Sequence, residues 1–281
     1  NLRQMTISMN KHPAHSLDAY RLIAKGETAY AEELERPLCP QCGGTGYARR
    51  EVDGVITMGR CRCKMLPDRI QLFNRAGIPS RYVNATFVSI AQTPDGQLKD
   101  LDPSAIRALG MCSQFIDAYL PGAINQGLVL HGDVGRGKTH LMVAMIRELI
   151  FRHGVPCRFI EFTRLLSMLK EGYSSGQSDA PMLGELSDIP VLAIDELGKG
   201  RMTDWELTII DEVISRRYNA LGCTLATTNY MPGEPTGNAP PNLATSQKLT
   251  QTLGDRVGDR VYSRLLQLVG FLEVEGKDHR A

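Results

Sequence analysis

The chain has 281 residues, of which 42% are hydrophobic and 22% are charged, and its formal net charge is +1. These values are ordinary for a soluble globular protein with one large domain and a small appendage. A net charge near zero gives no global reason to expect nucleic-acid or membrane binding, so any such contact must come from local charge. The sequence has no run of 18 apolar residues and no signal-peptide pattern, which predicts a cytoplasmic protein without membrane contact.

Residues 1–38 show a weak helical spacing of apolar side chains, with Ser16 as a candidate cap. This spacing predicts one or two N-terminal helices that carry no chemistry. The apolar positions are Leu17, Tyr20, Leu22, Ile23, Tyr30, Ala31 and Leu34.

Four of the seven cysteines form two close pairs, Cys39 with Cys42 and Cys61 with Cys63. An Asp-Gly dipeptide at positions 53–54 lies between the pairs and favours a tight hairpin turn, which would bring the pairs together. Four thiolates with this spacing predict a closed structural zinc site in a module too small for its own core. The second pair departs from the commonest spacing, because one residue separates its cysteines instead of two. Free surface cysteines or a redox pair are the alternatives.

The region that follows the first cysteine pair is locally basic. Residues 47–81 contain eight basic and three acidic side chains, a local net charge of +5. Such a region could contact the phosphates of a nucleic acid, and the alternative is a solvated charged face. Residues 70–81 predict a short helix ended by Gly77 and Pro79, and residues 91–104 predict a loop.

A glycine-rich motif, Gly132-x-x-x-x-Gly137-Lys138-Thr139, follows a short apolar run and precedes a helical pattern. Strand, glycine loop and helix are the context of the P-loop, in which backbone amides and a helix N-terminus surround phosphates. Lys138 is expected to reach the β- and γ-phosphates of ATP, and the Thr139 hydroxyl to ligate Mg²⁺. The alternative is a glycine-rich turn without a ligand. The predicted nucleotide-binding residues are Gly132, Asp133, Val134, Gly135, Arg136, Gly137, Lys138, Thr139 and His140.

Strand and helix patterns alternate around this motif, which predicts an α/β fold with a parallel sheet covered by helices on both faces. Cys112, Cys157 and Cys223 fall within these elements and are expected to be buried filler. The predicted elements are helix 105–120, strand 127–131, helix 138–153, strand 156–161, helix 163–172, a polar loop 173–180, strand 190–195, helix 203–220 and strand 223–228.

Polar side chains follow two of the predicted strands. Asp195 and Glu196 end an apolar strand, which would bring both carboxylates to the nucleotide. Asp195 is expected to hold Mg²⁺ through water, and Glu196 to orient and deprotonate the attacking water. The alternative is that the pair only starts a loop. Asn229 follows the next strand and would place an amide near the γ-phosphate.

Together these elements indicate the AAA+ class, and several stretches resemble the DnaC/DnaI-type replicative helicase loaders, whose relatives include the IstB-type transposition ATPases. The resemblance covers about residues 70–281, and the zinc module is similar to the N-terminal metal-binding part of some of these loaders. The stretches that carry it are Leu72–Pro79, Asn84–Phe87, Leu192–Gly198, Val213–Arg217, Thr228–Asn229, Gly258–Leu265 and Lys277–Arg280.

The resemblance implies further site residues and partners. Arg264 matches the arginine finger that reaches the γ-phosphate of a neighbouring subunit, with Arg260 as the alternative in a near-duplicate segment. Arg280 matches the sensor II arginine, and Asn229 fits sensor I. The family also implies an ATP-dependent spiral or filamentous oligomer, single-stranded DNA along its inner surface, and a hexameric replicative helicase held through the N-terminal region.

These observations predict three parts of the chain: an N-terminal helix and four-cysteine zinc-binding module at residues 1–67, a linker helix and loop at 68–104, and an AAA+ ATPase domain at 105–281. The favoured function is an ATP-hydrolysing helicase loader for the initiation of DNA replication. The alternatives are an IstB-like transposition helper that coats DNA and recruits a transposase, and an ATP-gated adaptor with negligible turnover. The intact Asp195-Glu196 pair argues against the adaptor.

Overall fold

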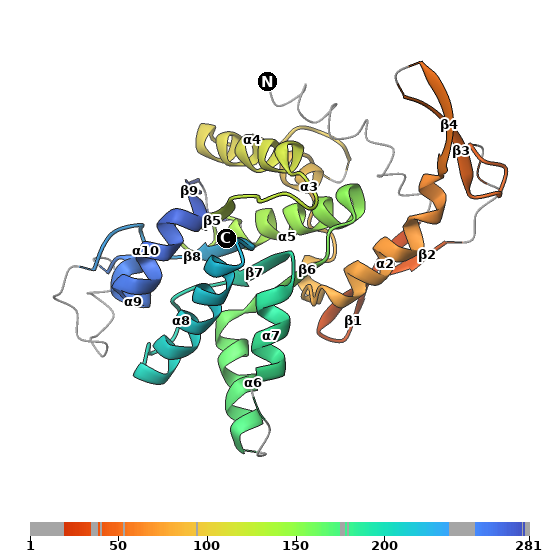
Figure 1. Cartoon of the computed structure of the whole chain (residues 1–281). Coiled ribbons are helices and arrows are strands. Elements are labelled where there is room, and N and C mark those ends of the chain that lie inside the picture. The colour runs from red at the N-terminus through yellow and green to blue at the C-terminus, as the bar shows by residue number, and fades with distance from the viewer. Residues whose placement is uncertain are drawn as a thin grey trace.

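The computed structural model describes residues 20–34, 39, 41–52, 54–93, 95–174, 178, 180–235, 251–276 and 278. A five-stranded parallel sheet lies at its centre, in the order β6-β7-β8-β5-β9. Figure 1 shows this sheet between layers of helices. The strands are β5 (Gly127–His131), β6 (Cys157–Glu161), β7 (Val191–Asp195), β8 (Cys223–Thr228) and β9 (Val269–Glu273).

Each strand of the sheet sends alternate side chains into two separate hydrophobic cores, as the pleat requires. In β5, Leu128 and Leu130 join one core and Val129 joins the other. The first core lies under α4 (Pro103–Ala118) and α5 (Lys138–Glu148), and the second under α6 (Phe162–Ser174), α7 (Ala180–Asp188), α8 (Asp204–Asn219), α9 (Leu253–Val257) and α10 (Asp259–Leu268). The sheet is therefore covered on both faces, and that prediction is confirmed.

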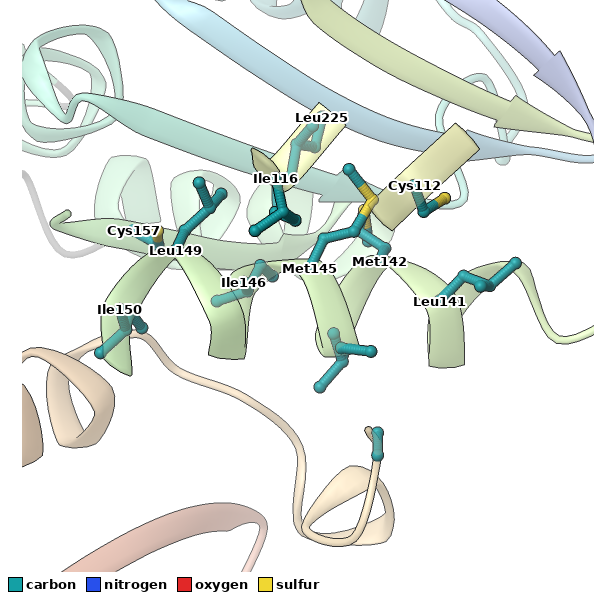
Figure 2. Packing of buried hydrophobic residues seen from close by; sticks show 14 of the residues in the cluster. Cys112, Ile116, Leu141, Met142, Met145, Ile146, Leu149, Ile150, Cys157 and Leu225 are labelled. Atoms are coloured by element: carbon teal, nitrogen blue, oxygen red, sulfur yellow. The ribbon is translucent and has the colours of Figure 1, made fainter. Parts of the chain in front are cut away.

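Figure 2 shows how closely the first core is filled. Met142 and Met145 of α5 lie beside Cys112 and Ile116 of α4, with Leu225 of β8 behind them. Because this core fixes α5 against the strands, it also fixes the start of α5, where the P-loop ends.

The predicted N-terminal helix is wrong where the structure describes it. Residues 20–33 form an antiparallel hairpin of β1 (Tyr20–Lys25) and β2 (Thr28–Glu33), with Gly26 at the turn. Burial in β2 alternates, because Ala29 and Ala31 face inward. Tyr20 stacks on Phe151 at 4.3 Å between ring centroids, so the hairpin packs on the first core. Ser16 and Leu17 lie outside the described residues.

The predicted hairpin between the cysteine pairs is present. β3 (Tyr47–Val52) pairs antiparallel with β4 (Val55–Arg60), and Val52 faces Val55 across the turn. A short turn, η2 (Arg62–Lys64), joins this hairpin to α2 (Leu66–Arg75). In Figure 1 the hairpin extends from α2 away from the sheet.

The other helices and strands differ from the predictions mainly at their ends. The helix predicted at 70–81 is α2, which starts and ends earlier, and two short elements follow it, η3 (Ser80–Tyr82) and α3 (Phe87–Ala91). Helix 138–153 is α5 continued by a π-helical turn, η4 (Leu149–His153). The sequence patterns did not predict α7, α9, α10 and β9. Among the described residues, no helix is both long and apolar enough to cross a membrane.

Candidate functional site

The P-loop runs from the end of β5 at His131 to the start of α5 at Lys138. Gly132, Gly135 and Gly137 all have positive φ, at 136°, 84° and 83°. A Cβ atom on Gly132 would lie 2.4 Å from the carbonyl oxygen of Val274, so that position has no room for a side chain. The loop therefore adopts the glycine-dependent turn that directs backbone N–H groups toward an anion at a helix N-terminus.

Lys138 is almost fully buried at the start of α5. Its Nζ donates to the carbonyl oxygens of Gly132 at 2.7 Å and Asp133 at 2.6 Å. These bonds keep a positive charge inside the turn of the loop, which fits a phosphate-binding role. Arg136 forms an ion pair with Asp133 at 3.5 Å within the loop.

Asp195 joins three separate parts of the sequence. Its Oδ1 accepts hydrogen bonds from the hydroxyls of Thr139 at 2.9 Å and Thr227 at 2.6 Å. Burial raises the pKa of Asp195, and the two hydroxyl donors counter part of that shift. A buried carboxylate next to a threonine hydroxyl is a hard oxygen donor set of the kind Mg²⁺ takes beside phosphates. The residues present therefore fit a magnesium ion.

Glu196 lies directly after β7 with its backbone in the left-handed region, at φ 56°. Its N–H donates to the Thr227 hydroxyl at 3.0 Å, which holds this turn against β8. The Glu196 carboxylate forms an ion pair with Lys199.

One cavity of about 160 Å³ brings these motifs together. It is lined by Tyr82, residues 134–140 of the P-loop and α5, Glu196, Thr227 and Asn229. The sequence motifs that were predicted to meet around ATP thus share one opening. Asp195 lies behind it, hydrogen-bonded to two of its lining threonines.

The family model described as IstB-like ATP binding protein matches residues 89–262, more than half of the chain. This chain belongs to that family. The "Replicative helicase loader DnaC" of Escherichia coli (strain K12) is 28% identical over 186 residues, 66% of this chain and 66% of the relative. The protein of the same name from Buchnera aphidicola subsp. Acyrthosiphon pisum (strain APS) is 28% identical over 149 residues, 52% of this chain and 56% of the relative.

A solved structure gives the same result for the fold. A crystal structure of the DnaC helicase loader matches with a TM-score of 0.56 and 29% identity, over 69% of this chain and 99% of that chain. The predicted resemblance to DnaC-type loaders and the predicted AAA+ P-loop fold are therefore confirmed. The matched region spans just under two thirds of the length of the Escherichia coli relative.

Arg264 and Arg260, the two candidates for the arginine finger, lie apart from the cavity. Arg264, on α10, donates to Asp211 of α8 at 2.7 Å, and its side chain is largely covered. Arg260 lies 3.6 Å from the same aspartate, with 73% of its side chain exposed. Neither lines the cavity. Arg280 lies outside the described residues.

Two further residues at the site were missed. Tyr82 comes from the segment before the core, and the only signal was the resemblance of its neighbours to the loaders. Thr227 supports both Asp195 and Glu196, yet a threonine inside a strand carries no signal of its own.

The predicted residue His140 shares a hydrogen bond of 2.9 Å with the hydroxyl of Ser89, which connects α3 to the start of α5.

The four paired cysteines form one cluster, with all Sγ atoms within 4.8 Å of one another. Two of these distances are 3.9 Å (Cys39 to Cys61) and 3.4 Å (Cys42 to Cys63). A tetrahedron with Zn–S bonds of about 2.3 Å has edges of roughly 3.8 Å, so the thiols fit a zinc ion.

The thiols of the cluster differ in pKa. The Gly46 N–H donates to Cys42 and lowers its thiol pKa to about 6. Burial and the neighbouring thiols raise the pKa of Cys63 to about 12. Without a cation, the four groups therefore cannot all ionise together near neutral pH. The other three cysteines are buried, as predicted.

Proposed function

We propose that this chain is an ATP-hydrolysing helicase loader that binds a hexameric replicative helicase and single-stranded DNA and delivers the helicase during the initiation of DNA replication. The observation that carries the proposal is the cavity shared by the P-loop, Glu196 and Asn229 in a chain similar to DnaC over the same region.

The P-loop, Asp195, Glu196 and Asn229 each have a place in the proposed reaction. Lys138 and the P-loop amides would hold the phosphates of ATP, and Thr139 with Asp195 would hold Mg²⁺. When bound, Mg²⁺ supplies positive charge that stabilises the negative oxygens of the phosphates. Glu196 would accept a proton from the attacking water, and the Asn229 amide would lie near the γ-phosphate. The positions of these residues around one cavity support the assignment.

A neighbouring copy of the chain would complete the site with an arginine. The exposed side chain of Arg260 favours it over Arg264, which already hydrogen-bonds Asp211 and Ser215 of its own chain. Mixed oligomers test this arrangement. Glu196→Gln subunits and Arg260→Ala subunits should each be inactive alone and should regain part of the turnover when mixed, because one supplies the arginine and the other the base. If Arg260→Ala alone retains full turnover, Arg260 has no such role.

The test of the loader proposal uses the purified full chain, the purified replicative helicase of the same cell, and single-stranded DNA. With ATP, we expect a stable complex with the helicase, transfer of the helicase onto circular single-stranded DNA, and loss of both with Lys138→Ala. A chain that splits ATP but neither binds nor transfers the helicase would not be a loader.

The second candidate is an IstB-like transposition helper, which the match to the IstB-like family favours. It predicts ATP-dependent coating of duplex DNA and capture of a purified transposase in place of the helicase. We propose that the four-cysteine module holds a structural zinc ion. This module favours the loader, because the resemblance stated above links it to loaders.

A further inference from the structure

Lys199 lies between two carboxylates at the edge of the nucleotide cavity. Its Nζ pairs with Oε2 of Glu196 and lies 4.0 Å from Oε1 of Glu161, the last residue of β6. The hydrogen bond to Glu196 raises the pKa of Lys199, so the ammonium stays charged at neutral pH. About half of the Lys199 side chain is exposed, at 51%. The accessible ammonium therefore lies beside two carboxylates at once, and one of them belongs to the proposed base.

The backbone of the loop that carries Lys199 is held in place. Arg256 of α9 donates to the carbonyl oxygens on both sides, to Gly198 at 3.0 Å and to Gly200 at 2.6 Å. The Lys199 N–H donates to the carbonyl of Glu196 at 3.0 Å. The freedom of Lys199 therefore lies in its side chain, whose four methylene groups can turn between the two carboxylates without any change in the loop.

We propose that the ion pair with Lys199 reversibly prevents Glu196 from acting as the base, an inference that rests on the proposed ATP hydrolysis. We call this ion pair the lock. In the structure, the Lys199 ammonium donates a hydrogen bond to Oε2 of Glu196, an oxygen of the carboxylate that would take the proton from water. Glu196 becomes available when Lys199 moves away. Glu161 lowers the free-energy cost of that movement, because its carboxylate remains beside the displaced ammonium. Lys199 is thus a positioning residue that acts through Glu196.

The ligand that opens the lock is the phosphate backbone of single-stranded DNA. Lys199 and Arg201 are both exposed on the same fixed loop, so they present two cations to solvent. Lysine and arginine contacts to backbone phosphates supply most of the sequence-independent binding of nucleic acids. A phosphate that binds Lys199 competes directly with Glu196 for the ammonium. Binding of DNA and hydrolysis of ATP are coupled in this way by a single side chain.

The test measures steady-state ATP hydrolysis by the full chain with Mg²⁺, with and without a saturating oligo-dT strand. The wild type should turn over slowly alone and severalfold faster with DNA. Lys199→Gln should turn over severalfold faster without DNA, with a KM for ATP within about twofold of wild type and no further stimulation. Lys199→Arg should restore both the slow basal rate and the response to DNA, which a merely structural role would not explain. Glu161→Gln should respond less to DNA, because the displaced ammonium loses its second partner.

A matched control is Lys170→Gln. Lys170 is similarly exposed, at 59%, and lies 3.7 Å from Glu206, away from the cavity, so its variant should behave as the wild type. An unchanged or lower basal kcat in Lys199→Gln, with an active wild type, overturns the lock. Absence of turnover in wild type and Lys199→Gln alike, with and without DNA, overturns the proposed ATP hydrolysis and the lock with it.

Discussion

Arg217 is a buried cation whose loss should loosen the strands that carry the site. Its side chain is fully buried, at 0% exposure, near the end of α8. Burial lowers the pKa of this guanidinium to about 10, so it remains charged at neutral pH. It donates to six uncharged acceptors, which are the carbonyls of Leu186 and Ser187 in α7, of Ile189 and Pro190 just before β7 and of Cys223 in β8, and the hydroxyl of Thr224 in β8.

The expected effect of Arg217→Met follows from these acceptors. Methionine keeps the apolar stem and removes every donor, so six acceptors lose a partner, and the four whose bonds are buried cost about 1 kcal/mol or more each. Part of this loss is offset, because the variant no longer has to desolvate a charge. We expect a net destabilisation of about 3 kcal/mol. Arg216 supplies the control, because it is half exposed and pairs with Glu212 at i,i+4, a contact worth about 0.3–0.5 kcal/mol.

The assay is urea unfolding of the two methionine variants and of the wild type, without nucleotide. Far-UV circular dichroism monitors the loss of structure. Arg217→Met should lower the midpoint strongly at a similar slope, and Arg216→Met should leave it nearly unchanged. ATP affinity should also fall in Arg217→Met, because Arg217 binds carbonyls next to the start of β7 and β8. Equal stabilities of the two variants would refute the reasoning.

Three further predictions concern the site, the sheet and the metal cluster. Burial raises the pKa of Asp195 in the folded protein above that of a free carboxyl group. The free energy of unfolding therefore falls as the pH rises from the usual carboxyl range through the raised pKa. Asp195→Asn should therefore melt higher than wild type at pH 7 without nucleotide, yet gain nothing from Mg·ATP; a lower melting temperature without nucleotide contradicts this. In Gly127→Ala the new Cβ would lie 2.0 Å from the carbonyl oxygen of Thr224, so β5 and β8 must separate, and we expect a loss of about 3 kcal/mol or insoluble protein. Gly184→Ala in α7 meets no atom within 4 Å and should be neutral or slightly stabilising in the same unfolding assay. Purified protein should contain about one equivalent of zinc, and a chelator should expose four titratable thiols while the three core cysteines stay unreactive; four reactive thiols before chelation would rule out the site.

The parts of the fold that the sequence predicts well are those whose cause is local. The apolar runs at β5 and β7 are buried on both faces of a parallel sheet, so their composition identifies them. The P-loop is predictable because its glycines are needed at positive φ and because Lys138 must start a helix. The cysteine cluster is predictable because the two pairs flank a hairpin turn.

The parts that the sequence does not predict depend on distant contacts. The residues of β1 and β2 suit a helix or a strand, and the stacking of Tyr20 on Phe151 decides between them. A second contact acts in the same direction, since the Asn74 side chain bonds the backbone N–H and carbonyl of Ala31. Lys199 is a similar case, because nothing in Gly-Lys-Gly indicates that its ammonium reaches two carboxylates at the ends of the neighbouring strands β6 and β7.

The repeated Gly-Asp-Arg triplet shows how one residue can separate two identical motifs. Arg256 and Arg260 are four positions apart, so on a continuous helix they would share a face. Gly258, at φ 83° and ψ 158°, ends α9 and starts α10 in a new direction. Arg256 is consequently buried against the loop of Lys199, with its guanidinium also stacked on Tyr230, while Arg260 faces solvent. Arg256 is therefore committed to its own chain, and Arg260 is the one of the two that a second copy can reach.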